Sequence, residues 1–353
     1  MRIAVIPGDG IGQEVISAAL RVLARIGDVV DGGIRCDVFD WGADKWLAES
    51  VGLPEGSLEV LRHEYDAILL GAFGDPRIPD MAHGRDILLG LRRGLDLCVN
   101  YRPVPLQGGS LDVYRENTQG LYVGVGGTVC VGNTAQVAID ECVYTRDTVE
   151  RFMQYCLADL RRRGRARVTL VHKSNAVPNT GGLWQDVFRR ELGRLPGLEG
   201  TEEYVDAFCY HLIRDPTRYE GVVTSNLFGD IVSDIGAALM GGLGLAASAS
   251  INPETGFGLF EPVHGSAPDI AGTGAANPYG ALMCVVLLLR HFGLETVANT
   301  LHSSLSEAVG TRAATPDVGG TGTTSAFTDE VLCRLNAKLS GELMSIHLEG
   351  TGQ

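Results

Sequence analysis

The sequence has little positive charge and no long apolar segment. Its 29 Lys and Arg residues stand against 43 Asp and Glu residues, which gives a formal net charge of −14 at pH 7. Because a nucleic-acid partner calls for a basic surface, this balance argues against nucleic acid as the main partner. The longest apolar run, Ala281 to Leu289, is too short to span a bilayer, so no membrane partner is expected. The opening segment MRIAVIPGDG has too few apolar residues for a signal peptide, which predicts a cytoplasmic location.

The eight cysteines form no recognisable motif. None belongs to a CxxC pair, and no Cys/His cluster has the spacing of a zinc site. Without a signal peptide, they are interpreted as reduced and mostly buried. The sequence also lacks repeats, low-complexity tracts and linkers.

A sizeable globular core is expected from what the sequence does contain. Its 353 residues have room for two packed domains or one large one, and 45% of them are hydrophobic. Strand-like runs alternate with helical patterns throughout, which predicts the α/β class. One predicted helix, residues 149–163, ends in the basic run Arg161 to Arg167, where positive charge would complement the helix dipole.

The first glycine-rich turn lacks the usual nucleotide-binding patterns. A strand-like run, Arg2 to Ile6, breaks at PGDG, and an amphipathic helix is predicted from Gln13 to Arg25. A strand, a glycine turn and a helix N-terminus can together cradle a phosphate. The turn GDGIG does not fit GxGxxG, however, and no Walker lysine follows it, so neither a typical Rossmann fingerprint nor a P-loop is present. A tight structural turn and a ligand loop both stay open.

Two carboxylates are predicted on one helix face. The stretch VVTSNLFGDIVSD, Val222 to Asp234, starts as a β-branched run typical of a buried strand and continues as a helical pattern. Asp230 and Asp234 are four residues apart, with no Lys or Arg in the segment to offset them. Paired carboxylates suit Mg²⁺ or Mn²⁺, and Asp206 is a candidate for a third ligand. The alternative is a solvated helix face.

Basic side chains and a tyrosine mark a second set of candidates. Arg92 and Arg102 are candidates for an anion clamp, since guanidinium groups match carboxylates bidentately, although arginine is also common on surfaces. Arg115 and Tyr122 lie at either end of the polar RENTQ turn. Lys173 follows a β run, where an ammonium without a partner would be costly to bury. Alternatively, its head simply reaches solvent.

Seven motifs, in order and with sensible spacing, resemble the β-decarboxylating dehydrogenase family, which includes isopropylmalate, isocitrate, homoisocitrate and tartrate dehydrogenases. The resemblance covers nearly the whole chain. The motifs are IPGDGIG (Ile6–Gly12), LRR…VNYRP (Leu91–Pro103), RENTQGLY (Arg115–Tyr122), HKSN (His172–Asn175), YVDA (Tyr204–Ala207), TSNLFGDIVSD (Thr224–Asp234) and FEPVHGSAPDIAG (Phe260–Gly272).

The resemblance implies a fold and a reaction. The fold is the two-domain isopropylmalate/isocitrate dehydrogenase-like α/β fold rather than a typical Rossmann fold. Residues 1–97 and 241–353 would form the cofactor-side domain, and residues 98–240 the second domain with the dimer contact. In the reaction, a 2-hydroxy acid is oxidised by hydride transfer to a nicotinamide, the β-keto acid loses CO₂ and the enol is protonated. A divalent ion, Mg²⁺ or Mn²⁺, acts as Lewis acid.

The resemblance also implies roles for the candidate residues. The metal ligands would be Asp206, Asp230 and Asp234, the general base Lys173, the acid Tyr122, and the carboxylate clamp Arg92, Arg102 and Arg115. Family members are dimers, so a homodimer is expected. In that dimer, Asp206 and Lys173 would reach the site from the neighbouring subunit.

Cofactor choice is predicted from one loop. Asp269 and Ile270 fall where the family discriminates NAD from NADP, and an acidic residue accepts hydrogen bonds from a ribose diol and repels a 2′-phosphate. The sequence therefore predicts NAD. The alternative is that Asp269 only caps the loop after Pro268. The other positions that match the cofactor site are Ile11, Glu261, His264, Gly265, Ser266, Ala267 and Asn277.

The substituent of the malate is predicted from one helix. Leu88 and Leu89 match the apolar pair that meets the isopropyl group in isopropylmalate dehydrogenases, which favours 3-isopropylmalate and leucine biosynthesis. Arg85 lies one turn earlier, and an arginine in this neighbourhood resembles the pattern of homoisocitrate dehydrogenases. Its guanidinium can pair with a third acidic group of the substrate. Alternatively, it points to solvent or to Asp86. Tartrate or malate, homoisocitrate, and a 3-substituted malate of a specialised pathway, such as a phosphonate analogue, stay open. So does a non-catalytic regulatory subunit.

Overall fold

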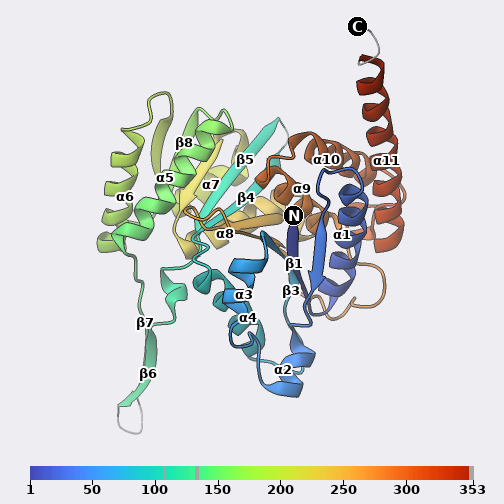
Figure 1. Cartoon of the computed structure of the whole chain (residues 1–353). Coiled ribbons are helices and arrows are strands. Elements are labelled where there is room, and N and C mark those ends of the chain that lie inside the picture. Colours follow the sequence, from blue (N-terminus) through green and yellow to red (C-terminus); the bar gives the residue numbers. More distant parts are fainter. Residues whose placement is uncertain (107, 132–134, 350–353) are drawn as a thin grey trace. The chain divides into compact units, whose positions relative to one another are not determined.

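The chain forms two compact units, and both contain strands and helices (Figure 1). The computed structural model describes residues 1–106, 108–131 and 135–349. Unit 1 comprises Met1–Gly90, Gly241–Ala249 and the chain from Gly258 on, and unit 2 comprises Leu91–Met240 and Ser250–Phe257. The chain crosses between them inside helix α4 (Ala82–Gly94), after Met240, inside strand β11 (Ala247–Ile251) and after Phe257. The predicted α/β class is confirmed.

Unit 1 is built on parallel strands in the order β2-β1-β3-β12. Every residue of β3 and β12 is buried, and so is all of β1 after its first residue. Such unbroken burial is typical of parallel strands that are covered on both faces. The bounds are β1 (Arg2–Gly8), β2 (Arg35–Val38), β3 (Ala67–Ala72) and β12 (Gly258–Pro262).

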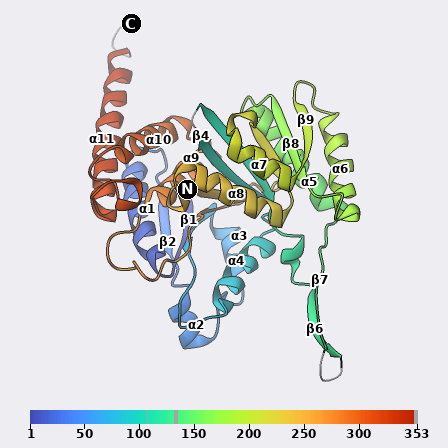
Figure 2. The same ribbon diagram turned by 180° about the vertical axis from the view of Figure 1, so that it is seen from behind.

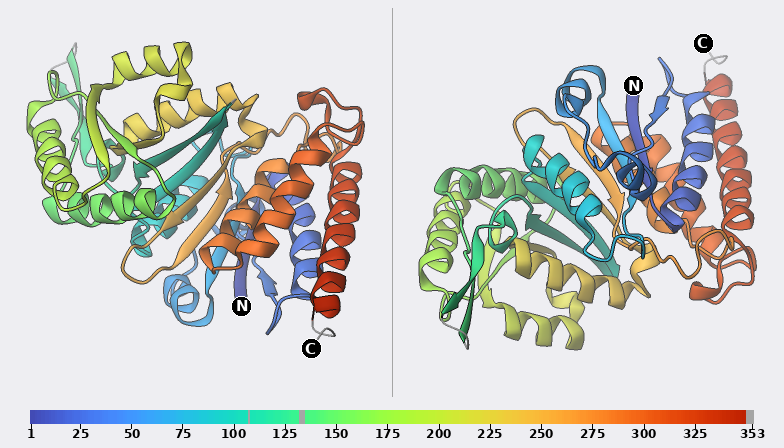
Figure 3. Two further views of the ribbon diagram at one scale, coloured as in Figure 1. Left: turned by 90° about the horizontal axis from the view of Figure 1, so that it is seen from above. Right: turned by 90° about the horizontal axis from the view of Figure 1, so that it is seen from below.

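Helices α1 and α9 pack against these strands, while α10 and α11 pack on α9 and α1. Figure 3 shows blue α1 beside red α11. The apolar run from Ala281 to Leu289 lies within α9 and is entirely buried, so it is a core helix. No helix within the described ranges is long and apolar enough to cross a membrane. The helices of unit 1, besides the first part of α4, are α1 (Ile11–Gly27), α2 (Ala43–Glu49), α3 (Ser57–Glu64), α9 (Tyr279–His291), α10 (Glu295–Val309) and α11 (Thr324–Glu349).

Unit 2 contains strands in the order β4-β5-β10-β8-β9. The pair β4 and β5 is antiparallel, and the other neighbours are parallel. Helices α5 and α6 cover one face of these strands in Figure 1, and α7 and α8 cover the other in Figure 2. The bounds are β4 (Val99–Leu106), β5 (Gly109–Glu116), β8 (Arg167–His172), β9 (Glu199–Tyr204), β10 (Gly221–Thr224), α5 (Arg146–Arg162), α6 (Pro178–Leu192), α7 (Val205–Arg214) and α8 (Asn226–Met240).

The parallel strands of unit 2 end at a common edge. Thr224 at the end of β10 pairs with Arg115 of β5 on one side and with Val171 of β8 on the other. In open α/β sheets, ligands bind beyond the carboxyl ends of the strands. The strand order therefore directs attention to the residues that close β5, β8 and β10.

A two-stranded ribbon projects from the rest of unit 2 (Figure 1). It pairs β6 (Gly126–Val131) with β7 (Ala135–Asp140) in antiparallel register. Val129, Val137 and Ile139 on this ribbon are exposed. A lone two-stranded hairpin is marginally stable in water, and clustered exposed apolar side chains mark interaction surfaces. The ribbon is therefore a candidate contact surface.

Candidate active site

Arg115, near the end of β5, is the most deeply buried of the candidate arginines, with 2% of its surface exposed. Its Nε and Nη2 donate to Oδ1 of Asn226 over 3.1 and 2.8 Å. Its Nη1 forms an ion pair with Asp230. The strand pairing explains this arrangement, because Arg115 lies beside Thr224 and Asn226 opens α8 two residues later.

Asp230 and Asp234 lie one turn apart on α8 and both approach Arg102. The guanidinium nitrogens Nη2 and Nη1 are 3.6 Å from Asp230 Oδ1 and 3.7 Å from Asp234 Oδ1. Arg102 is itself held in place, because it donates to Asn100 Oδ1 over 2.9 Å and to Ser233 Oγ over 2.7 Å. The two carboxylates thus face buried positive charge and are not simply a solvated helix face.

Tyr122 approaches the same carboxylate from the loop after β5. Its hydroxyl donates to Asp230 Oδ2 over 2.8 Å, and the Arg115 guanidinium lies 5.3 Å from the centre of its ring. Burial, followed by the hydrogen bond and charge of Asp230, raises the pKa of Tyr122. The phenol therefore keeps its proton at neutral pH.

The pKa values of the two aspartates shift in opposite directions. Burial alone would raise the pKa of Asp230, but the charges of Arg115 and Arg102, the Tyr122 hydrogen bond and the charge of Arg92 outweigh it and lower the pKa. The pKa of Asp234 is raised by burial and by the negative charge of Asp230. All three predicted clamp arginines therefore act on Asp230.

Lys173 and Asp206 form a separate pair. Lys173 follows β8, Asp206 opens α7, and the Lys173 ammonium donates to Asp206 Oδ1. The hydrogen bond from Lys173 lowers the pKa of Asp206, whose side chain is 68% exposed. Within residues 1–106, 108–131 and 135–349, no three His, Cys, Asp or Glu side chains are arranged to hold a metal ion. In a single chain, Lys173 therefore lies with Asp206, while Arg92, Arg102, Arg115, Tyr122 and Asp234 lie around Asp230.

The glycine turn of unit 1 is tied to the predicted cofactor loop. The N–H of Ile11 donates to the carbonyl of Ser266 over 2.8 Å. A Cβ on Gly10, which has φ +54°, would lie 2.1 Å from that carbonyl oxygen. Only glycine fits there, which gives the GDGIG turn a structural reason. Asp9 adds to it by accepting hydrogen bonds from the N–H groups of Ala43 and Gly74.

Other predicted cofactor positions differ in what they contact. His264 Nδ1 bonds to the carbonyl of Gly265 over 2.9 Å, and burial lowers the pKa of this imidazole. Asp269 is exposed, while Glu261 is buried. The amide of Asn277 donates to Asp317 over 2.9 Å and accepts from the N–H of Tyr279 over 3.0 Å, so it caps the start of α9.

The predicted substituent-binding residues lie along α4. Leu88 and Leu89 are half-buried. Arg85 is exposed, and its guanidinium lies 4.0 Å from Asp80. Asp86, the partner considered from the sequence, instead accepts from the N–H of Leu53 over 3.2 Å.

Several residues of the Asp230 centre escaped the sequence analysis. They are the polar side chains that hold the arginines, namely Asn100, Asn226 and Ser233. Asn226 stands in the stretch that drew attention to Asp230 and Asp234, but an asparagine before a helical pattern reads only as the start of the helix. Its contact with Arg115 spans 111 residues of sequence.

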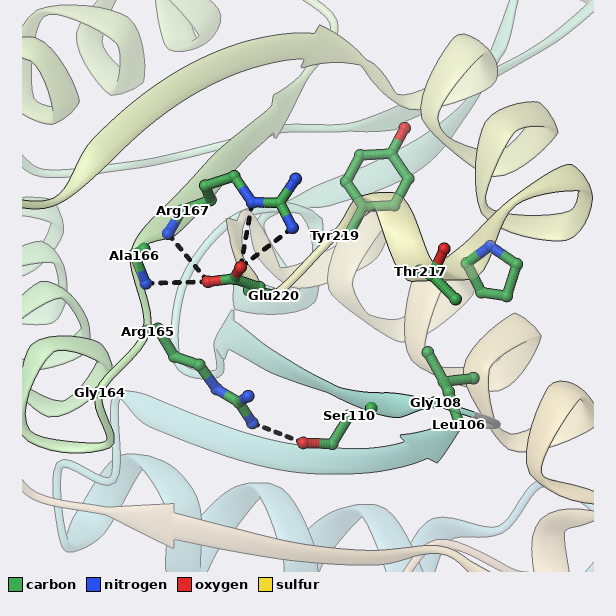
Figure 4. A pocket seen from close by; sticks show the side chains of 12 residues that line it. Leu106, Gly108, Ser110, Gly164, Arg165, Ala166, Arg167, Thr217, Tyr219 and Glu220 are labelled. Atoms are coloured by element: carbon green, nitrogen blue, oxygen red, sulfur yellow. Dashed lines mark hydrogen bonds and ion pairs between the residues drawn. The ribbon is translucent and has the colours of Figure 1, made fainter.

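A cavity of about 330 Å³ lies elsewhere in unit 2 (Figure 4). It adjoins the amino ends of β8 and β10, the edge opposite to Thr224. Arg167 pairs there with Glu220, while Arg165 bonds to Ser110 Oγ over 2.5 Å and to Asp112 Oδ2 over 2.6 Å. Because these charged groups pair with one another, we interpret the cluster as a fastening of the loop before β8.

The family model for isocitrate/isopropylmalate dehydrogenase matches residues 2–331. A 3-isopropylmalate dehydrogenase of Thermobifida fusca is 40% identical over 349 residues, 95% of this chain and 98% of that protein. A probable tartrate dehydrogenase/decarboxylase of Bacillus subtilis is 37% identical over 347 residues, 94% of this chain and 97% of that one. The crystal structure of isocitrate dehydrogenase from Methylococcus capsulatus matches with a TM-score of 0.85 and 33% identity, over 95% of this chain and 99% of that one. The chain belongs to the isocitrate/isopropylmalate dehydrogenase family of decarboxylating dehydrogenases.

Proposed function

We propose that the protein catalyses the NAD-dependent oxidative decarboxylation of a 3-substituted malate, with 3-isopropylmalate as the preferred substrate. The observation that carries the proposal is the convergence of Arg92, Arg102, Arg115 and Tyr122 on Asp230. Three buried guanidinium groups at one point suit a ligand with two carboxylates. A non-catalytic regulatory subunit would not require the whole set of candidate aspartates, lysine, tyrosine and arginines, and all of them are present.

The donor set fits a divalent cation. Asp230 and Asp234 offer hard oxygen ligands on one face of α8, and we propose that Asp206 of a second copy completes the set. When bound, Mg²⁺ or Mn²⁺ would supply Lewis-acid polarisation of the substrate oxygen. Asp230 already accepts from Arg115 and Tyr122, so the same residue positions the clamp and the acid.

The chain's own residues divide the proton chemistry between them. The clamp arginines bind and orient the malate carboxylates. Lys173 accepts the proton of the substrate hydroxyl at Nζ. Tyr122, whose pKa is raised by burial and by Asp230, gives a proton to the enol carbon from its hydroxyl.

The preference for NAD rests on Asp269, which is exposed in the loop after β12. A carboxylate there can accept from a ribose diol and would repel a 2′-phosphate. Measuring kcat/KM with both cofactors tests this preference, and a higher value with NADP would contradict it.

The choice of substituent rests on α4. The half-buried Leu88 and Leu89 favour an isopropyl group, and a relative named 3-isopropylmalate dehydrogenase is 40% identical. Arg85 is the observation that favours a second candidate, an anionic substituent as in homoisocitrate or a phosphonate, because its guanidinium is exposed. Tartrate and malate are included because a probable tartrate dehydrogenase is 37% identical.

The deciding experiment is NADH production with Mn²⁺ from 3-isopropylmalate, tartrate, malate, isocitrate and homoisocitrate, with and without a chelator. We expect the highest kcat/KM with isopropylmalate and loss of turnover with the chelator. The matched variant Arg85→Ala should leave isopropylmalate turnover nearly unchanged. If the same change abolished turnover of an acidic substrate that the wild type prefers, the isopropyl assignment would be wrong.

We further propose a homodimer that shares its sites. Exposed apolar side chains lie on the β6–β7 ribbon and on α7, where Tyr210 and Ile213 are 55% and 60% exposed. Obligate interfaces are rich in such apolar surface. The domain assignment from the sequence, 1–97 with 241–353 and 98–240, stays a prediction.

A further inference from the structure

The side-chain amide of Asn226 bonds both to the candidate clamp and to a neighbouring loop. It is the first residue of α8 and is 1% exposed. Its Oδ1 accepts from both Nε and Nη2 of Arg115, which occupies both of the oxygen's lone pairs. Its Nδ2 donates to the carbonyl of Gln119 over 2.9 Å. An amide turned the other way would place NH₂ groups against the guanidinium, so these contacts fix its orientation.

The contact with Arg115 orients a charge without neutralising it. An uncharged amide occupies one edge of the guanidinium, and the remaining nitrogen, Nη1, is directed at Asp230. A carboxylate in the same place would also hold the arginine, but it would offset the positive charge that the clamp needs for an anion. Asparagine therefore does here what aspartate cannot.

The contact with Gln119 fixes the loop that carries Tyr122. The Gln119 side-chain amide donates to the hydroxyls of Thr145 and Thr148. The main-chain N–H of Gln119 donates to Glu116 over 2.9 Å. Asn226 adds a bond to the Gln119 carbonyl, three residues before Tyr122. One buried amide thus joins the arginine of β5, the start of α8 and the loop of the proposed acid.

We propose that Asn226 is a positioning residue for the reaction, which sets the direction of the Arg115 charge and the place of the Tyr122 loop. The proposal rests on the proposed function for its kinetic consequences. Its geometric part concerns the loop alone and can be measured on the protein without substrate.

The informative variant is Asn226→Asp, which keeps the size of the side chain. It removes the donor to Gln119 and places a carboxylate beside Arg115. A carboxylate in the first turn of a helix is favourable and would pair with Arg115, which offsets the lost hydrogen bond to Gln119, so Tm should stay near the wild-type value. The KM for the malate substrate should rise and kcat should fall, together by 10- to 100-fold in kcat/KM, on the order seen when groups that orient binding residues are removed. Malate binding measured by calorimetry should weaken, and hydrogen exchange in residues 117–123 should speed up.

Asn252→Ala is the matched control. Asn252 is a buried asparagine of the same unit, and its amide likewise donates to a main-chain carbonyl, that of Leu95, over 3.0 Å. The Asn252→Ala variant should have a lower Tm, while its KM, its kcat and hydrogen exchange in residues 117–123 should stay as in the wild type. If the control reproduced the kinetic losses, or if Asn226→Asp left binding and exchange unchanged, the inference would be overturned. A different result would be a wild type that turns over none of the substrates, while Asn226→Asp still weakens malate binding and speeds exchange relative to it. That result would refute the proposed function and support the positioning role.

Discussion

At Asp230, burial and neighbouring charge act on the pKa in opposite directions, and charge prevails. The carboxylate is ionised because Arg115 and Arg102 lie against it. This single residue therefore joins the proposed metal ligands, the clamp and the acid. Its removal should affect chemistry far more than cofactor binding, whose predicted residues belong to unit 1.

Asp230→Asn should abolish oxidation, with kcat reduced by about three orders of magnitude, the upper range for loss of one preorganised electrostatic contact. NAD binding, followed by fluorescence or calorimetry, should stay nearly intact. A variant that kept substantial turnover would show that the metal assignment is wrong.

Asp159 shows the same competition away from the site and predicts a pH effect on stability. Burial would raise its pKa, but Arg163, the hydroxyl of Tyr114 and Arg162 outweigh burial and lower it. The folded chain thus binds this proton less tightly than the unfolded chain does. The resulting stabilisation is fully present above the ordinary pKa of about 3.9 and is lost as the pH falls through the lowered folded-state value.

Asp159→Asn should lower the free energy of unfolding by about 1–3 kcal/mol at pH 7, because it removes the buried carboxylate that accepts hydrogen bonds from Tyr114, Arg162 and Arg163. Urea unfolding of both proteins at a series of pH values checks this. The difference between them should be constant from pH 7 to pH 5 and should shrink at lower pH; a difference that grew on acidification would contradict the assignment.

At the scale of elements, α8 can approach β5 only because residue 229 is glycine. A Cβ at this position would lie 2.5 and 2.6 Å from Cγ and Cβ of Arg115. In contrast, a Cβ on Gly182 in α6 would meet nothing within 4 Å. The two glycines are therefore a matched pair, one required by packing and one not.

Gly229→Ala should destabilise the protein by about 1–3 kcal/mol, as expected for overpacking, and lower kcat/KM because Arg115 is displaced. Gly182→Ala should stabilise it by roughly 0.5–1 kcal/mol, since alanine is favoured over glycine inside a helix. Thermal unfolding and the NADH assay measure both. Equal behaviour of the two variants would contradict the packing argument.

The elements themselves were largely predictable, because each depends on local pattern. The helix expected over Gln13 to Arg25 is α1, and the basic run from Arg161 closes α5 and leads into β8. The start of α5 was missed: it begins at Arg146 rather than 149, because the Thr145 side chain accepts from the N–H of Thr148. The arginines, Tyr122 and Asp234 around Asp230 were named from the sequence, but Asn100, Asn226 and Ser233 were not. The geometry of the cluster was not predictable, since it depends on the pairing of β5 with β10.

At the scale of the whole molecule, the proposed homodimer predicts that each active site takes residues from both copies. Lys173 pairs with Asp206, while the clamp and Tyr122 surround Asp230. In a symmetric dimer that shares sites, Lys173 of one copy would serve Asp230 of the other.

Mixing two inactive variants tests this arrangement. In a heterodimer of Lys173→Ala with Asp230→Asn, one site carries both changes and the other carries none. Random exchange of subunits should therefore restore about a quarter of wild-type activity, as two-fold symmetry requires. Separate variants provide the baseline, and a mixture no more active than the variants alone would show that each chain supplies its own site.

On the β6–β7 ribbon, the side chains of Val129, Val137 and Ile139 are exposed to solvent, so the stability of the ribbon depends on what covers it. If a second copy supplies that cover, folding and association are one equilibrium and obey mass action. The protein would then have no single melting temperature: Tm would climb with each tenfold increase in protein concentration, and dilution would expose the ribbon to proteases before the rest of the chain unfolds. In that case, a stability value for this chain has meaning only when its concentration is stated beside it.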